Sequence, residues 1–110
     1  MAYSIVFSEY AVQDLNDLHE FGTLQDSSVR ADAVLDQIEK VCAGLAELPN
    51  RGRRVPELEE FGELRFREIR IKPWRIFYRV TGKRIYIHGI LDGRRSLRAI
   101  LAKRAYQPES

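Results

Sequence analysis

Apolar positions in the first half of the chain follow one short strand pattern and then two helical patterns. Residues 3–7 are mostly β-branched or aromatic, which predicts a strand. Ser8 stands where a helix N-cap is expected, and the apolar stripe of the first helix consists of Ala11, Leu15 and Leu18. This helix is expected to end near Gly22, and its polar side is predicted to carry Asp14, Asp17 and Glu20.

A second amphipathic helix follows a short polar link. Its cap is Ser27 or Ser28, and residues 49–52 are expected to end it. Its apolar stripe consists of Val34, Ile38, Val41, Leu45 and Leu48. Two adjacent helices joined by so short a link are expected to pack antiparallel as a hairpin. Burial in the core accounts for both stripes, so neither is interpreted as a binding site.

Alternating patterns replace the helical ones after Gly52. Residues 64–71 alternate but change phase near Glu68, which predicts a β-bulge there. Residues 74–80 alternate throughout, and residues 81–83 predict a hairpin turn. In the strand after this turn, one face is predicted to consist of Ile85, Ile87, Gly89 and Leu91.

The last periodic segment, residues 95–105, predicts a basic closing helix. The whole pattern therefore predicts an α+β fold in a single domain over residues 1–110. Its expected elements are an N-terminal strand, an antiparallel helical hairpin, an antiparallel three-stranded meander that completes the sheet, and a short C-terminal helix.

Charge divides the chain into two unlike halves, although the net charge is only +2. Residues 1–50 hold two basic and nine acidic residues, a net charge of −7. Residues 51–110 hold sixteen basic and seven acidic residues, a net charge of +9. This asymmetry favours an anionic partner for the basic half.

Composition excludes several classes of protein. With 45% hydrophobic residues the chain is expected to fold, and its apolar runs are too short to span a membrane. The N-terminus lacks the pattern of a signal peptide, and a single cysteine, Cys42, forbids an intramolecular disulfide. We therefore expect a cytoplasmic protein with no membrane segment, no metal site and no cofactor.

The strongest chemical signal is the basic meander. Eight basic residues and one acid, Glu68, lie between Arg65 and Arg84. Period-two spacing is expected to place Arg65 with Arg67 on one strand face, and Arg75 with Arg79 on a face of the next strand. Three anions are open as partners: phosphates, an acidic protein, or the acidic faces of the chain's own helices.

Residues with catalytic potential are few. His19 is interpreted as a solvated helix residue, and His88 as a half-buried strand residue in preference to a general base. Cys42 is interpreted as a small core filler. Glu68, flanked by arginines, is interpreted as the centre of a salt-bridge cluster.

Three segments resemble the RelE/ParE superfamily of toxins from type II toxin–antitoxin modules. They are GELRFREIR at residues 62–70, WRIFYRV at residues 74–80 and ILDGRRSL at residues 90–97. The strand and aspartate-rich helix at the N-terminus fit as well, so the resemblance extends over nearly the whole chain.

The resemblance implies one of two activities. RelE-like members are ribosome-dependent mRNA endoribonucleases, and Arg75 and Arg95 match their phosphate-stabilising arginines. The catalytic aromatic residue of that branch would fall near Leu101, and Tyr106 comes too late to replace it. ParE-like members lack this catalytic set and inhibit DNA gyrase, trapping it with broken DNA. The longer helical hairpin and the LDGRR segment favour the ParE-like branch. A plain nucleic-acid-binding module remains a third hypothesis.

Both branches imply a cognate antitoxin and a hetero-oligomer with it. The C-terminal segment of the antitoxin would fold on the toxin, with acidic side chains at Arg65, Arg67 and Arg79 and apolar anchors in exposed grooves. The basic patch expected to meet the target or the antitoxin consists of Arg65, Arg67, Arg75, Arg79, Arg94, Arg95 and Arg98. The partners implied are thus an antitoxin and DNA gyrase, or in the alternative the ribosome and mRNA.

Overall fold

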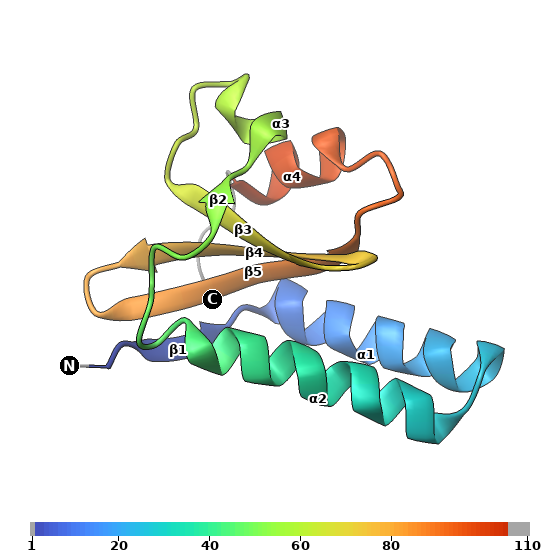
Figure 1. Ribbon diagram of the computed structural model, residues 1–110. Helices are drawn as coiled ribbons and strands as arrows, with labels where there is room; N and C mark the ends of the chain where they lie inside the picture. Colours follow the sequence, from blue (N-terminus) through green and yellow to red (C-terminus); the bar gives the residue numbers. More distant parts are fainter. Residues whose placement is uncertain (1, 106–110) are drawn as a thin grey trace.

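The chain folds around one five-stranded sheet in a computed structural model that describes residues 2–105 (Figure 1). The strands are β1 (Ser4–Phe7), β2 (Arg53–Arg54), β3 (Phe66–Ile71), β4 (Trp74–Thr81) and β5 (Arg84–Asp92). Their order in the sheet is β1-β5-β4-β3-β2, with β1 parallel to β5 and the other neighbours antiparallel. The predicted N-terminal strand and three-stranded meander are confirmed, and the two-residue β2 is an addition.

Helices cover both faces of this sheet. The four helices are α1 (Glu9–Gln25), α2 (Ser28–Gly44), α3 (Pro56–Glu59) and α4 (Arg98–Ala105). Figure 1 shows the antiparallel pair α1 and α2 on one face and the short helices α3 and α4 on the other. The helical hairpin and the C-terminal helix are confirmed. The single turn α3 lies in a segment that carried no helical pattern.

Serine caps begin the two long helices, as the sequence predicts. The Ser8 hydroxyl accepts a hydrogen bond from the Ala11 amide at 3.1 Å, and the Ser27 hydroxyl accepts one from the Arg30 amide at 3.2 Å. The predicted ends are less accurate. α1 continues three residues past Gly22. This glycine does not end the helix but lies in the contact between the two helices, where an added Cβ would lie 3.3 Å from the Cβ of Ala31.

The predicted end of α2 is also wrong. The helix stops at Gly44, with Leu45 as its C-cap, so Leu48 lies beyond it and is exposed. Leu45 itself is fully buried, so the apolar stripe is real as far as that residue.

The bulge expected at Glu68 is absent from β3, which pairs with β4 without a register shift from Phe66 to Ile71. The change of phase has another cause. Phe66 packs under α3 and α4, whereas Ile69 and Ile71 pack under the helical hairpin, so both faces of this strand contribute to a core. When only one face of a strand is assumed to be buried, apolar residues on both faces look like a change of phase in the alternation.

The observed bulge lies in β5. Phe77 pairs with Gly89 and Tyr78 pairs with Ile87, which leaves His88 as the extra residue. After it the faces exchange, so that Ile90 joins the hairpin core and Leu91 joins the core under α4. The predicted face is therefore correct only as far as Ile87.

Two buried clusters result, one on each side of the sheet. The larger lies under α1 and α2 and includes Ala11, Ile38, Cys42, Ile76, Tyr78, Ile85, Ile87 and Ile90. The smaller lies under α3 and α4 and consists of Val55, Leu58, Phe66, Phe77, Leu91, Leu97, Leu101 and Ala105. The strand β4 contributes to both clusters, because Ile76 and Tyr78 face one side of the sheet and Phe77 faces the other.

Candidate functional site

Arg75 is held in a buried double ion pair beneath α3. Its side chain is only 6% exposed. One side of the guanidinium donates to the Glu57 carboxylate at 2.6 and 2.8 Å, and the other donates to the Glu68 carboxylate at 2.8 and 2.7 Å. The hydrogen bonds with Glu57 and then Glu68 raise the pKa of Arg75, and the Arg75 hydrogen bond lowers the pKa of Glu57. With two carboxylates already bound, this guanidinium is not positioned to receive a phosphate.

Glu68 is the centre of this cluster, which confirms its interpretation from the sequence. The side chain is fully buried and also accepts from Arg70 Nε at 3.1 Å. Arg53 from β2 lies 3.6 Å from the same carboxylate. A buried carboxylate with three arginines around it is a structural ion-pair cluster.

Three of the other six arginines of the predicted patch also form ion pairs with other described residues of the chain. Arg65 pairs with Glu63 at 2.6 Å, Arg94 with Asp92 at 2.7 Å, and Arg98 with Glu60 at 3.0 Å. The Arg65 hydrogen bond lowers the pKa of Glu63, and the Arg94 hydrogen bond lowers the pKa of Asp92. The chain's own acidic side chains were one of the three partners considered for these cations. They therefore neutralise a large share of the positive charge.

The predicted patch does not form one surface. Arg65 precedes β3, while Arg67 lies on the hairpin side of the sheet, where its guanidinium donates to the Gly52 carbonyl at 2.8 Å. Arg79 lies on the opposite side, with its guanidinium 5.7 Å from the centre of the Phe66 ring. Arg65 precedes Phe66, which pairs with Arg79 across β3 and β4, so these two arginines are near each other. Burial and then the charge of Arg65 lower the pKa of Arg79.

The remaining arginines lie at the other end of the sheet, beyond the end of β5. Arg94 and Arg95 are both exposed there, in the connection to α4. Arg95 contacts no acidic side chain among residues 2–105. The structure thus brings Arg65 and Arg79 together, and separately Arg94 and Arg95.

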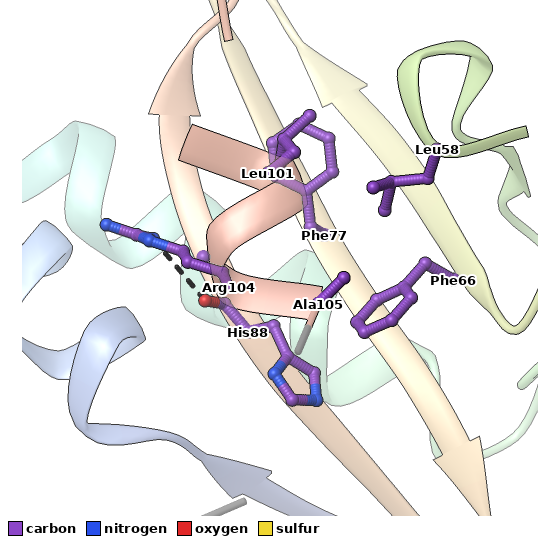
Figure 2. Close-up of a pocket in the computed structure, with 8 residues that line it drawn as sticks. Leu58, Phe66, Phe77, His88, Leu101, Arg104 and Ala105 are labelled. Carbon is purple, nitrogen blue, oxygen red and sulfur yellow. Dashed lines mark hydrogen bonds between the residues drawn. The ribbon is translucent and has the colours of Figure 1, made fainter. Parts of the chain in front are cut away.

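His88 is enclosed more deeply than the sequence predicted. It lies beneath α4 beside a cavity of about 10 Å³, with Phe66, Phe77 and Leu101 among the lining residues (Figure 2). Its Nε2 is buried and has no hydrogen-bond partner among the described residues. Burial, followed by the charges of Arg79, Arg104 and Arg65, lowers the pKa of His88 to about 4. The imidazole is therefore neutral at pH 7 and shielded from a substrate.

The other two candidates match their predicted surroundings. Cys42 is fully buried in the hairpin core, and burial raises the pKa of its thiol to about 12, so it is a core residue. His19 is partly exposed, and its Nε2 lies 2.6 Å from an Asp32 carboxylate oxygen on the neighbouring helix. Tyr106 lies outside the described residues.

One buried contact was missed in the sequence. Asp14 was placed on the polar side of α1, but it is only 8% exposed and accepts from the Ile90 amide at 3.0 Å and from Arg104 at 2.6 and 3.1 Å. β1 ends at Phe7, so this part of the β5 edge has no strand beside it and needs another acceptor. In the sequence, Asp14 follows Ala11 by three residues and precedes Leu18 by four, a spacing that places it on the apolar stripe of the helix. This spacing was the signal that could have predicted its burial.

Arg104 reaches Asp14 from the other side of the sheet. The guanidinium passes over Gly89, where an added Cβ would lie 2.6 Å from Arg104 Nη1, and stacks 4.5 Å from the centre of the Tyr10 ring. We refer to Asp14, Arg104 and the Ile90 amide as the clasp, because together they join α1, β5 and α4.

Within residues 2–105, no group of three or more His, Cys, Asp or Glu side chains could hold a metal ion. No helix in that range is long and apolar enough to cross a membrane.

Helical hairpin, mixed sheet and small C-terminal helix together define the RelE/ParE fold. Solved structures share it: the chromosomal ParDE TA system from P. aeruginosa gives a TM-score of 0.68 at 21% identity, over 83% of this chain and 96% of that one. The toxin–antitoxin complex RelBE2 from Mycobacterium tuberculosis gives 0.62 at 18% identity, over 84% and 99%. A mutant of E. coli toxin RelE in the free state gives 0.66 at 17% identity, over 97% and 100%.

Sequence comparison narrows the fold to a family. Residues 5–97 match the family described as ParE toxin of type II toxin–antitoxin system, parDE. Toxin ParE3 of Caulobacter vibrioides is 38% identical over 74 residues, which cover 67% of this chain and 70% of that protein. The chain therefore belongs to the ParE toxin family of type II toxin–antitoxin systems.

Proposed function

We propose that this chain is a toxin that inhibits DNA gyrase in the cytoplasm and is neutralised by a cognate antitoxin. The observation that carries the choice of gyrase over mRNA is the state of Arg75. In the nuclease hypothesis this arginine stabilises a phosphate, whereas here it is buried and bound by Glu57 and Glu68. Freeing it would leave Glu57 without its partner and would remove the main partner of the buried Glu68.

The surroundings of His88 support the same choice. Cleavage of RNA by attack of the 2′-hydroxyl needs a base within reach of the substrate. His88 is buried beneath α4, and the charges of Arg79, Arg104 and Arg65 all oppose its protonation. Membership of the ParE family, together with a relative named Toxin ParE3, supports a mechanism based on binding.

A paired assay tests this proposal. Purified chain is added to DNA gyrase with relaxed plasmid, and separately to ribosomes translating a defined mRNA. We expect loss of supercoiling with accumulation of linear DNA in the first assay, and intact mRNA in the second. Cuts in the mRNA that need ribosomes and disappear in Arg95→Ala would overturn the proposal in favour of the nuclease.

Neutralisation has its own test. The genome is searched for a small reading frame beside the gene, and the protein that it encodes is purified and added before gyrase. We expect it to restore supercoiling when it is equimolar with the chain. Inhibition that persists at a large excess would contradict the assignment of that protein as the antitoxin.

A further inference from the structure

A hollow opens at the end of the sheet where β3 turns into β4. It lies between this turn and the connection from β5 to α4, at right in Figure 1. A backbone hydrogen bond of 2.7 Å from the Gly93 amide to the Pro73 carbonyl joins the two segments. The hollow measures about 350 Å³, which is within the range of pockets that bind small ligands. We call it the turn site.

The lining of the turn site is cationic. Arg70 and Lys72 border it on the side of the turn, and Arg94 borders it on the side of the connection. None of the described residues that line it carries a carboxylate. Arg75 also lines it, but its guanidinium is already bound by two carboxylates. The cations that an entering anion meets are therefore the other three.

Part of this positive charge is not compensated within the chain. Arg70 and Arg94 each have an acidic partner, yet their side chains remain 51% and 75% exposed. Lys72 is exposed and forms no ion pair with any other residue in the range 2–105. Like charges that share one hollow repel each other, so this grouping gains nothing for the fold. It favours an anionic ligand instead.

Trp74 gives the turn site an aromatic wall. It is the single tryptophan of the chain, and it is half-buried because it packs against the hairpin core. Among the described residues, neither another ring nor a cation stacks on its indole. An aromatic ring beside several cations is how proteins bind nucleic acid with unstacked bases, since a base stacks on the ring and the phosphates meet the cations.

The surroundings restrict how DNA can approach. Asp17 of α1 lines the next hollow, which shares Trp74 with the turn site, and the whole helical hairpin is acidic. A duplex lying along the molecule would bring its phosphates toward these carboxylates, and its bases would be covered by their own stacking. The end of a duplex avoids both penalties, because its last base has lost one stacking neighbour and only its final phosphates come close.

We propose that the turn site binds the end of broken DNA, with the terminal base stacked on Trp74 and the phosphates beside it paired with Lys72 and Arg94. This inference rests on the proposed function, to which it adds a direct contact between the chain and the DNA that gyrase has cleaved. A contact made with broken DNA alone stabilises the cleaved state relative to the resealed state. The linear DNA expected in the gyrase assay follows from that shift.

Two DNA probes and matched variants of the full chain test the site. One probe is a short fluorescent duplex with open ends, and the other is a duplex of the same sequence closed by a loop at each end. The test variants are Trp74→Leu and Lys72→Gln, with Trp74→Phe as the variant that keeps a ring. Their controls are Phe61→Leu, at another partly exposed aromatic residue, and Lys103→Gln, at an exposed lysine of α4. Circular dichroism checks that each variant is folded.

We expect the wild type to bind the open duplex at least about tenfold more tightly than the closed one, with quenching of the Trp74 emission. Trp74→Leu should abolish this preference, and Trp74→Phe should retain most of it. Lys72→Gln should weaken binding and reduce the slope of log affinity against log salt concentration by about one. Each control should change the affinity less than about threefold.

Gyrase then tests what the contact does. The amount of each variant bound to gyrase is measured by co-purification, and linear DNA is compared at equal amounts bound. We expect Trp74→Leu and Lys72→Gln to leave at least about threefold less linear DNA than the wild type, because the cleaved state loses its extra contact. Phe61→Leu and Lys103→Gln should leave as much as the wild type.

The possible failures are distinguishable. Equal affinity of the wild type for the two duplexes, or unchanged Trp74 emission, would overturn the inference and reduce the site to cations that attract any duplex. As much linear DNA in both test variants as in the wild type would overturn the role in trapping and leave gyrase inhibition intact. A wild type without effect on gyrase would overturn the proposed function, and the two duplexes would still decide whether the site binds DNA ends.

Discussion

Arg75 illustrates how the neighbours of a residue decide its role. Its place in the aromatic–arginine strand motif suggested a group that stabilises phosphate. In the fold, α3 brings Glu57 over the sheet and β3 places Glu68 beside it, so the same guanidinium joins two elements. The acids that complete this cluster are seven and eighteen residues away in sequence, which is why the strand motif alone did not reveal it.

Removing the Arg75 guanidinium should destabilise the fold. We expect Arg75→Met to lower the free energy of unfolding by about 3 to 5 kcal/mol, because Glu68 would remain buried without its main partner. The exposed pair of Arg94 and Asp92 is the control, and Arg94→Met should lower the free energy of unfolding far less, because solvent screens this pair. Urea unfolding at pH 7 measures both. Equal losses in the two variants would contradict a structural role for Arg75.

His88 should make stability depend on pH. Its pKa is about 4 in the folded chain against 6.5 ordinarily, so the unfolded chain binds the proton first as the pH falls. The contribution of neutral His88 to the free energy of unfolding is fully present above pH 6.5 and is lost between pH 6.5 and 4. At pH 5 the loss is about 2 kcal/mol. Urea unfolding at pH 7.5 and pH 5 should show this loss in the wild type and in His19→Gln, and not in His88→Leu. The same loss in His88→Leu would refute the assignment of this pH dependence to His88.

The elements were predicted more reliably than their edges and faces. Periodicity and serine caps identified α1, α2 and the meander, because those signals are local. The bulge at His88, the one-turn α3 and the burial of Asp14 escaped prediction for a different reason. Each depends on a second layer of helices over the sheet, which alternation along a single strand does not show. The separation of the arginines onto two faces has the same origin.

The clasp connects elements that are far apart in sequence. The Asp14 carboxylate of α1 accepts a hydrogen bond from the Ile90 amide at the unpaired edge of β5. Arg104 of α4 donates to the same carboxylate and so joins α4 to α1. The docking of α4 therefore depends on a residue 90 positions earlier.

Asp14→Ala should loosen α4 more than any other helix. We expect a loss of about 3 kcal/mol in the free energy of unfolding, since the Ile90 amide and the Arg104 guanidinium would both lose their acceptor. Hydrogen exchange measured by mass spectrometry should accelerate most in α4. Asp17→Ala, one turn further along the exposed side, should change neither quantity appreciably. Unchanged exchange in α4 would show that the clasp does not hold this helix.

Over the whole molecule, the charge asymmetry of the sequence becomes a division between layers. The acidic half forms the helical hairpin with β1, and the basic half forms the rest of the sheet with α3 and α4. Much of the basic charge is compensated by nearby acids such as Glu57, Glu63 and Glu68. What remains is an excess of exposed cations, distributed at both ends of the sheet.

This excess should give binding of the antitoxin an electrostatic component. We expect Arg65→Glu and Arg67→Glu to weaken the complex with the protein encoded beside the gene and to reduce its sensitivity to salt. Lys40→Glu, on the outer surface of α2, is the control. The dissociation constant is measured from 50 to 400 mM NaCl. A slope that matches the wild type in the arginine variants would contradict this expectation.

The central claim is that the chain acts on gyrase by binding and without cleaving RNA. The most direct measurement is the amount of linear DNA that purified gyrase releases from supercoiled plasmid as the chain is added. We predict that linear DNA increases with the concentration of the chain, and that the adjoining gene's product abolishes the increase. Gyrase that remains fully active at saturating chain, while the same preparation cuts mRNA on ribosomes, would contradict the account.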